Sequence, residues 1–223
     1  MYKQTDTFQI QRDNMVSYQI ERRGIRDSRV LSALREVPRH LFVPEIYQDS
    51  AYEDGPLPIG SNQTISQPYI VALMTHLLQL QGDENVLEVG TGSGYQAAIL
   101  AKLAKTVHTI EIHAELTKKA TAIFAALDLD NIYVHVGDGS LGWEPASPYH
   151  AIVVTAAAPS VPQPLLQQLS DRGRLVIPVG PPRGQILEVW QREGESFHQR
   201  ENIPVSFVPL RGRYGWTVEA WER

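Results

Sequence analysis

From Asn85 onward, the chain alternates between short apolar runs and longer segments with helical spacing. The apolar runs, rich in β-branched residues, are Val86–Val89, Val107–Ile112, Ile132–Val136, Ile152–Thr155 and Leu175–Val179. The helical segments between them are Tyr95–Ala104, Ala114–Leu127 and Pro162–Leu169. Because consecutive parallel strands need a crossover that is usually a helix, this alternation predicts a parallel sheet with helices on both faces.

The last fifth of the chain carries a different pattern. Ile186–Arg192 and Ile203–Leu210 have the composition of strands, with only a short connection between them. They predict an antiparallel pair at the edge of the sheet. Together with the earlier runs, they predict an α/β fold with a doubly wound, mostly parallel sheet of seven strands and an antiparallel C-terminal edge.

Helices and loops are expected before the sheet. Residues 15–37 carry apolar positions at helical spacing and predict two helices, the second capped by Asp27. The first dozen residues are polar, and we expect them to be frayed. Residues 38–68 are rich in Pro, Gly and Asn and predict irregular structure. Pro68–Leu80 has one apolar face and predicts a further helix.

The length and composition fit one globular domain over residues 1–223. We expect an extension of helices and loops over 1–80, a sheet core over 81–210 and a tail over 211–223. The chain has no cysteine, which excludes disulfides, thiol nucleophiles and zinc sites of the cysteine type. The histidines are scattered except for the loose pair His108 and His113, so we predict no metal site. That pair spans the end of a strand, and we expect both residues at the surface or behind the groups that touch a ligand.

Charge and hydropathy limit which partners and which cellular compartment we expect for the protein. The formal net charge of −5 argues against a broad basic surface for nucleic acid. No apolar run approaches the length of a membrane span, and the first 25 residues lack the apolar segment of a secretory signal. We therefore expect a cytoplasmic protein, a monomer, that binds neither nucleic acid nor membranes.

Candidate chemistry begins where the first strand ends in an acid and three alternating glycines follow. Gly90, Gly92 and Gly94 allow a tight turn and a close approach of the backbone to a ligand. Glu88 adds a carboxylate, which would repel a phosphate at short range but suits a cationic or hydroxyl-bearing ligand. The loop therefore favours the sulfonium nucleoside S-adenosylmethionine over ATP.

The following strand ends carry groups that complete such a site, because ligands of open α/β sheets bind beyond the carboxyl ends of the strands. Glu111, 17 residues after Gly94, is placed to hold ribose hydroxyls. Asp138, between two glycines, can accept a hydrogen bond from the amine of adenine, and Thr155 begins a run of small residues that leaves room for a ligand. The candidate cofactor-binding residues are Glu88, Gly90, Thr91, Gly92, Ser93, Gly94, Glu111, Asp138, Gly139 and Thr155.

The glycine loop also permits other interpretations. Gly92–Ala97 matches the dinucleotide fingerprint and Glu111 matches its acid, so the loop alone does not separate NAD from S-adenosylmethionine. Glu88 and Asp138 favour the second ligand. A tight turn with ordinary surface acids is the plainest alternative.

A second candidate site precedes the sheet. The polar segment Leu57–Tyr69 runs into a helix opened by Pro68. Thr64, Ser66 and Gln67 would lie where the helix N-terminus offers free amides and a partial positive charge, which suits a carboxylate. The alternative is that Ser66 or Gln67 simply caps the helix, and composition alone favours the cap.

Several segments, taken in order, resemble one enzyme family. They are Val37–Pro44, Ala51–Tyr52, Leu57–Gly60, Gln63–Tyr69, Leu87–Tyr95, Gly137–Gly139 and Ile152–Ala157. Their order resembles that of the protein-L-isoaspartate O-methyltransferases, from about Ser17 to Leu210. The stretch Gln63–Pro68 is particular to that family, whereas the glycine loop is shared with many methyltransferases. The residues before Met15 and the tail Arg211–Arg223 carry no motif that we can assign. Arg211 and Arg213 could attract the carboxylate of the substrate, but a solvated tail is the favoured interpretation.

The resemblance implies a sheet of the S-adenosylmethionine-dependent methyltransferase type, with residues 1–80 on the substrate side. It implies methyl transfer from S-adenosylmethionine to the α-carboxyl of L-isoaspartyl residues in damaged proteins and peptides. The methyl ester then closes to a succinimide, which reopens partly to normal aspartate. By the same resemblance Ser66 is the catalytic, orienting hydroxyl, with Thr64 and Gln67 as substrate-binding neighbours.

Three rival functions stay open at this stage. The first is a methyltransferase for another acceptor, such as RNA or a small molecule, although the acidic net charge weighs against RNA. The second is a non-enzymatic module that binds S-adenosylmethionine. The third is an NAD-dependent oxidoreductase, which the glycine fingerprint permits.

Overall fold

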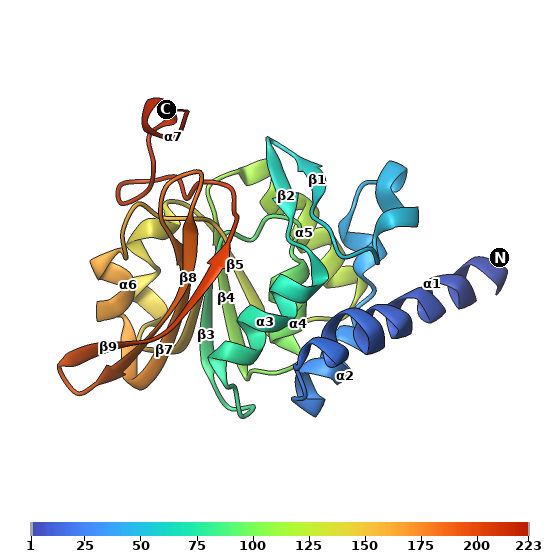
Figure 1. Ribbon diagram of the computed structural model, residues 1–223, viewed down its shortest axis with the longest axis horizontal. Helices are drawn as coiled ribbons and strands as arrows, with labels where there is room; N and C mark the ends of the chain where they lie inside the picture. The colour runs from blue at the N-terminus through green and yellow to red at the C-terminus, as the bar shows by residue number, and fades with distance from the viewer. Residues whose placement is uncertain (1, 223) are drawn as a thin grey trace.

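The computed structural model describes the backbone of residues 2–222 and the side chains of residues 7–200 and 203–222. Its centre is a sheet in the order β5-β4-β3-β6-β7-β8-β9 (Figure 1). The strands are β3 Asn85–Val89, β4 Thr106–Glu111, β5 Ile132–Val136, β6 Tyr149–Val154, β7 Leu169–Val179, β8 Gln185–Glu193 and β9 Ser196–Val205. The pairs from β5 to β7 are parallel, and β8 and β9 pair antiparallel. The predicted fold class is confirmed.

The strand order reverses between β3 and β6. The chain builds outward from β3 through β4 to β5, then crosses back to place β6 on the other side of β3. Val89 pairs with Val154 at the ends of these strands, so Gly90 and Thr155 start their loops side by side. Such a reversal is where open α/β sheets bind ligands.

Helices cover both faces of the sheet, as the sequence predicts (Figure 1). The helices are α1 Tyr2–Asn14, α2 Ser28–Glu36, α3 Pro68–Leu78, α4 Tyr95–Ala101, α5 Ala114–Ala126, α6 Gln163–Gln167 and α7 Val218–Trp221. Val86 and Val153 pack with the side chains of α2 to α5, whereas Leu87 and Ile152 pack with those of α6. Successive side chains of a strand point to opposite faces, so one strand supplies both cores.

The N-terminal segment differs from the frayed chain expected from its polarity. It is helical as α1, and a π-helical turn over Met15–Ile20 follows directly. Phe8 is buried and stacks on His40 with the ring centroids 4.1 Å apart. This contact with a distant segment holds a helix whose own sequence gives little sign of it. The capped helix α2 is confirmed, because the Asp27 carboxylate accepts from the amides of Arg29 and Val30.

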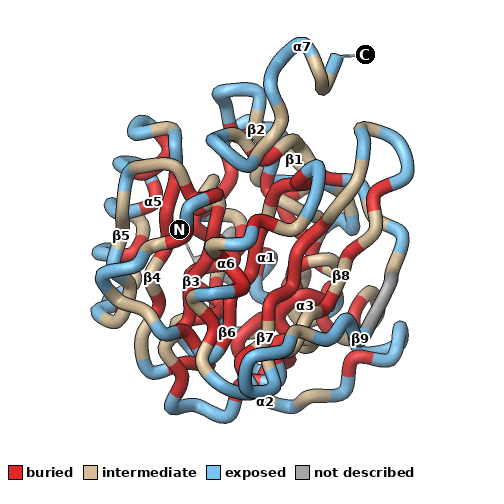
Figure 2. The backbone as a smooth tube through the Cα atoms, turned by 90° about the vertical axis from the view of Figure 1, so that its left-hand side faces the viewer, coloured by how far each residue is buried: buried red, intermediate tan, exposed pale blue. Residues whose placement is uncertain are grey.

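Two further differences lie near the end of the sheet where β3 and β6 finish. The region 38–68, expected to be irregular, contains the hairpin β1 (Leu57–Gly60) and β2 (Gln63–Ile65). The last strand was expected over Ile203–Leu210, but β9 ends at Val205, so only the first residues of the expected segment are in the strand. Figure 2 shows the buried strands of the sheet with the hairpin and α7 beyond one end of them. No helix in the described part of the chain is long and apolar enough to cross a membrane.

Candidate active site

The turn after β3 fits against the start of the loop after β6. Gly90 has a φ of +96°, and a Cβ added there would overlap Oγ1 of Thr155. That hydroxyl donates to the carbonyl oxygens of Val89 at 3.1 Å and Gly90 at 2.7 Å. A residue with a side chain rarely adopts this φ, so the close contact requires glycine.

Gly94 ends the same loop and begins helix α4. Its φ is +91°, and a Cβ there would lie 2.7 Å from ring carbons of Phe124. We expect Gly94→Ala to lower the free energy of unfolding by about 1–2 kcal/mol for the left-handed backbone and by about 1–3 kcal/mol more for the overlap. Gly24→Ala is the matched control, because Gly24 has a φ of +99° and nothing within 4 Å of its Cβ position. Denaturant unfolding should show a clearly larger loss for Gly94→Ala; equal losses would contradict the packing explanation.

Glu111, at the end of β4, is the acid that faces the loop. Its side chain is buried, with Oε2 accepting from the Gly92 amide at 2.9 Å and Oε1 accepting from the His113 amide at 3.0 Å. Each oxygen has a second lone pair for a further donor. The carboxylate therefore fixes the loop, and Glu111 lines the space beside it, where it can offer a further acceptor.

Glu88, expected beside the ligand, lies under the loop instead and does not line the pocket. The alternation of β3 turns Glu88 towards the face covered by α3 to α5, the same face as Val86, and away from the face of Val89. Its side chain is 0% exposed, and Oε2 accepts from Oγ1 of Thr109 at 2.5 Å. Oε1 has no partner in the described part of the chain. Burial raises the pKa of Glu88 to about 8, so this carboxyl is mostly protonated at neutral pH.

Glu88→Gln should change how stability depends on pH. The pKa of Glu88 is about 8 in the folded protein, against 4.5 for an exposed glutamate. Between these values the folded state holds one more proton than the unfolded state, so the free energy of unfolding falls as pH rises. Glutamine does not ionise and escapes this loss. Denaturant unfolding from about pH 5 to about pH 8.5 should show the free energy of unfolding of the variant rising relative to that of the wild type as pH increases. A difference that stays constant with pH would contradict a buried, neutral Glu88.

Asp138 also lies outside the main pocket, in a network with the C-terminal tail. Oδ1 accepts from the amide and hydroxyl of Ser140, at 2.9 and 2.6 Å. Oδ2 accepts from the Arg213 amide at 2.7 Å. The expected acceptor for adenine is thus bonded to neighbouring backbone, and the next residue, Gly139, lines the pocket in its place.

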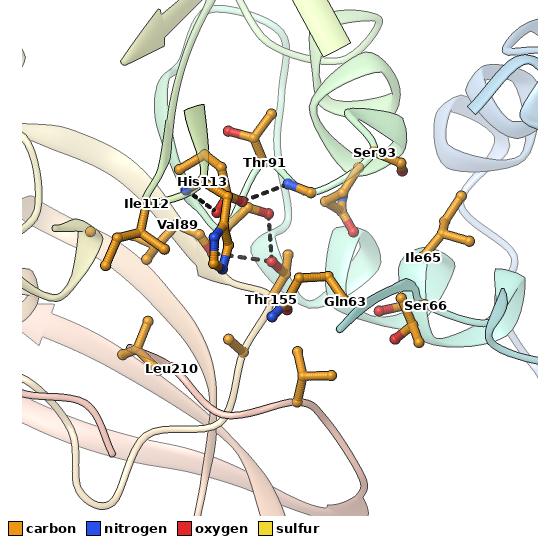
Figure 3. Close-up of a pocket in the computed structure, with 18 of the residues that line it drawn as sticks. Gln63, Ile65, Ser66, Val89, Thr91, Ser93, Ile112, His113, Thr155 and Leu210 are labelled. Carbon is orange, nitrogen blue, oxygen red and sulfur yellow. Dashed lines mark hydrogen bonds between the residues drawn. The ribbon is translucent and has the colours of Figure 1, made fainter. Parts of the chain in front are cut away.

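Ser66 follows β2 at the mouth of helix α3. Gln67 is the N-cap residue of α3 and its side chain makes no capping hydrogen bond, whereas Oδ1 of Asp54 accepts from the Tyr69 amide in the first turn at 3.2 Å. The Ser66 hydroxyl has no hydrogen-bond partner in the described part of the chain. Capping, the plainer interpretation of Ser66, is therefore wrong. Ser66 instead lines the pocket, across from Ile112 (Figure 3).

A buried arginine fixes the backbone of Ser66. Nη2 of Arg39 donates to the Ser66 carbonyl at 2.8 Å, and Nε donates to the Ala51 carbonyl at 2.7 Å. The guanidinium is 0% exposed and lies 4.8 Å from the centre of the Tyr95 ring, the first residue of α4. Burial lowers the pKa of Arg39 to about 10, which leaves it charged at neutral pH. One side chain thus connects the Ser66 segment to the helix that follows the glycine loop.

Two adjoining spaces form the site. The inner pocket lies between the glycine loop, Glu111 and the Ser66 segment, and the outer cleft lies between that segment, the chain after β9 and α7. The candidate residues that line the inner pocket are Thr64, Ser66, Gly90, Thr91, Gly92, Ser93, Glu111, Gly139 and Thr155. Gln67 lines only the outer cleft. Among the described residues, no group of three His, Cys, Asp or Glu side chains is placed to hold a metal ion.

The site brings together the glycine loop, which suits a nucleoside, and the unpartnered hydroxyl of Ser66. Comparison with known proteins shows the family. The family model of protein-L-isoaspartate(D-aspartate) O-methyltransferase matches residues 10–215. The chain belongs to this family.

Similar proteins span nearly the whole chain. A protein-L-isoaspartate O-methyltransferase of Methanoregula boonei is 54% identical over 92% of this chain and 95% of its own length. Protein-L-isoaspartate O-methyltransferase 1 of Syntrophobacter fumaroxidans is 53% identical over 94% and 98%. A Plasmodium falciparum protein ascribed to the same activity, solved with S-adenosyl-L-homocysteine, is 25% identical with a TM-score of 0.78, and the match covers 90% of this chain and 98% of that one.

Sequence reasoning missed some of the residues that build this methyltransferase site. Arg39 stands in the segment Val37–Pro44 that carries the family resemblance, but nothing in its position revealed a bond to Ser66 27 residues later. His113 was expected at the surface or behind the groups that touch a ligand, and it lines the inner pocket. Arg211, for which a solvated tail was favoured over attraction of the substrate carboxylate, lines both spaces. Only the fold brings these residues to the site.

Proposed function

We propose that the protein transfers a methyl group from S-adenosylmethionine to the α-carboxyl of L-isoaspartyl residues in damaged proteins and peptides. The ester then closes to a succinimide, which begins repair. The observation that carries the proposal is the meeting of the glycine loop and the unpartnered Ser66 hydroxyl in one pocket of a chain of this family.

The donor set of the inner pocket fits a nucleoside cofactor. Glu111 offers carboxylate oxygens to ribose hydroxyls, and the backbone of Gly90–Ser93 lets the ligand come close. Ile112, 45% exposed, and Leu210 supply apolar surface for a base (Figure 3). S-adenosylmethionine, when bound, supplies an activated methyl group on a sulfonium. An acid at this end of the pocket also suits a positively charged ligand.

The acceptor side needs orientation more than proton transfer. A carboxylate is ionised at neutral pH, so the reaction requires no general base. The Ser66 hydroxyl can donate to one carboxylate oxygen and hold the other towards the methyl group. Thr64 and Gln67 flank it on the hairpin and at the start of α3, which supports a substrate role for residues 1–80.

The partners follow from the same chemistry. Isoaspartyl proteins and peptides are the acceptors, and the net charge of −5 favours them over nucleic acid. We place the protein in the cytoplasm as a monomer, and size-exclusion chromatography with light scattering tests the second point directly.

The reaction product tests the proposal. Mass spectrometry of an isoaspartyl peptide incubated with protein and S-adenosylmethionine should show a methylated peptide first and its succinimide later. An RNA of mixed sequence, incubated in parallel, should stay unmethylated. Methylated RNA with an unchanged peptide would overturn the proposed acceptor, and binding of NAD in place of S-adenosylmethionine would overturn the proposed cofactor.

A further inference from the structure

Arg211 stands at the junction of the two spaces of the site. It lines both the inner pocket and the outer cleft. Among the described residues, it is the one charged side chain that lines the outer cleft. The sequence places it in a tail without a motif, yet the fold brings it next to the Ser66 segment.

The backbone around Arg211 is held in place. The Leu210 amide donates to the Ala157 carbonyl, and the Ala157 amide donates to the Val208 carbonyl, both at 2.8 Å. The Trp216 amide donates to the Leu210 carbonyl at 2.8 Å, and Nη1 of Arg211 donates to the Trp216 carbonyl at 3.0 Å. These bonds fasten the residue to the loop that follows β6, which limits the entropy lost when its side chain binds a ligand.

Charge is divided between the two ends of the pocket. Glu111 lies beside the glycine loop, where a sulfonium nucleoside is favoured, and Arg211 lies on the side that opens into the outer cleft. The net charge of −5 gives the protein no general attraction for an anionic substrate. A cation in the cleft supplies that attraction locally.

We propose that Arg211 binds the carboxylate of the isoaspartyl substrate and makes the site select a charged acceptor. The inference rests on the proposed function and assigns a specificity-determining residue to it. One N–H of the guanidinium is committed to Trp216, and the remaining donors serve the substrate. With Ser66 as a second donor, Arg211 fixes the carboxylate between the hairpin and the tail.

Arg213 provides a matched control from the same tail. Its amide bonds Asp138, but its side chain lies over the ring of Tyr214, 5.8 Å from the ring centre. It lines neither the inner pocket nor the outer cleft. Arg213→Gln therefore removes the same charge from the tail and leaves the backbone hydrogen bond in place.

The preference for a charged acceptor can be measured with two peptides that differ in one charge. One carries L-isoaspartate and the other the corresponding carboxamide, L-isoasparagine, and calorimetry gives both dissociation constants in the presence of S-adenosylhomocysteine. The wild type should prefer the isoaspartyl peptide by roughly ten- to hundredfold. Arg211→Gln should lose most of this preference, Arg211→Lys should keep part of it, and Arg213→Gln should keep all of it. The affinity for S-adenosylhomocysteine should stay the same in all four proteins.

The outcomes separate the inference from the proposed function. A wild type that methylates the isoaspartyl peptide while Arg211→Gln keeps the full preference overturns the role of Arg211 alone. A wild type that binds neither peptide overturns the proposed function and the inference with it. If Arg211→Gln does not fold, the salt dependence of binding to the wild type tests the inference instead. Rising salt should weaken the binding of the isoaspartyl peptide and leave the binding of the carboxamide peptide unchanged. Equal effects of salt on both affinities overturn the inference.

Discussion

Replacing Ser66 by alanine is expected to lower the turnover of an isoaspartyl peptide by about a hundredfold, because small errors in the placement of reacting groups are costly. Ser66 lines the inner pocket, and its hydroxyl has no partner in the described part of the chain. Its loss removes an orienting donor and leaves the fold intact, since Arg39 holds the Ser66 backbone through its carbonyl.

Turnover and cofactor affinity must be measured together on this variant. Initial rates give kcat for the peptide, and calorimetry gives the affinity for S-adenosylmethionine. Ser32→Ala, an exposed serine of α2 bonded only to Glu36, controls for the loss of a hydroxyl. A large loss of S-adenosylmethionine affinity in Ser66→Ala, with kcat unchanged, would contradict the acceptor-side role.

Replacing Glu111 by alanine should act mainly on the cofactor. The change removes the acceptors of the Gly92 and His113 amides together with those offered to ribose hydroxyls. We expect S-adenosylmethionine binding to weaken by about 1–3 kcal/mol, or roughly ten- to hundredfold, from the lost hydrogen bonds to a charged group.

Glu115→Ala is the matched control for Glu111→Ala. Glu115 lies in the first turn of α5, four residues further on, and is exposed. Calorimetry should show its affinity for S-adenosylmethionine close to that of the wild type. Equal affinities for the wild type and Glu111→Ala would show that the carboxylate does not hold the cofactor.

The sheet could be predicted because its strands are buried on both faces. Such strands appear as continuous apolar runs, and β3, β4 and β6 begin within a few residues of the predicted positions. The strand β9 lies at the edge and has the polar sequence SFHQRENIPV, which carries no such run. The apolar residues after it were therefore taken for the strand itself.

The site could be predicted where local sequence sets the structure, and not where the fold does. Gly90 and Thr155 meet because β3 and β6 are neighbours, a consequence of the predicted topology. Glu88 was placed beside the ligand from its charge, but the alternation of β3 buries it under the loop. Arg39 is bonded to Ser66 across 27 residues, and Arg211 lines the same pocket as Ser66, and no local pattern encodes either arrangement.

Methyl transfer to two peptides, identical except for L-isoaspartate or L-aspartate at one position, tests the central claim most directly. Labelled S-adenosylmethionine reports the initial rate for each peptide. The inner pocket, with its nucleoside end at Glu111 and its acceptor end at Ser66, predicts transfer to the isoaspartyl peptide alone. Transfer to both peptides at equal rates, or to neither while S-adenosylmethionine is bound, would contradict it.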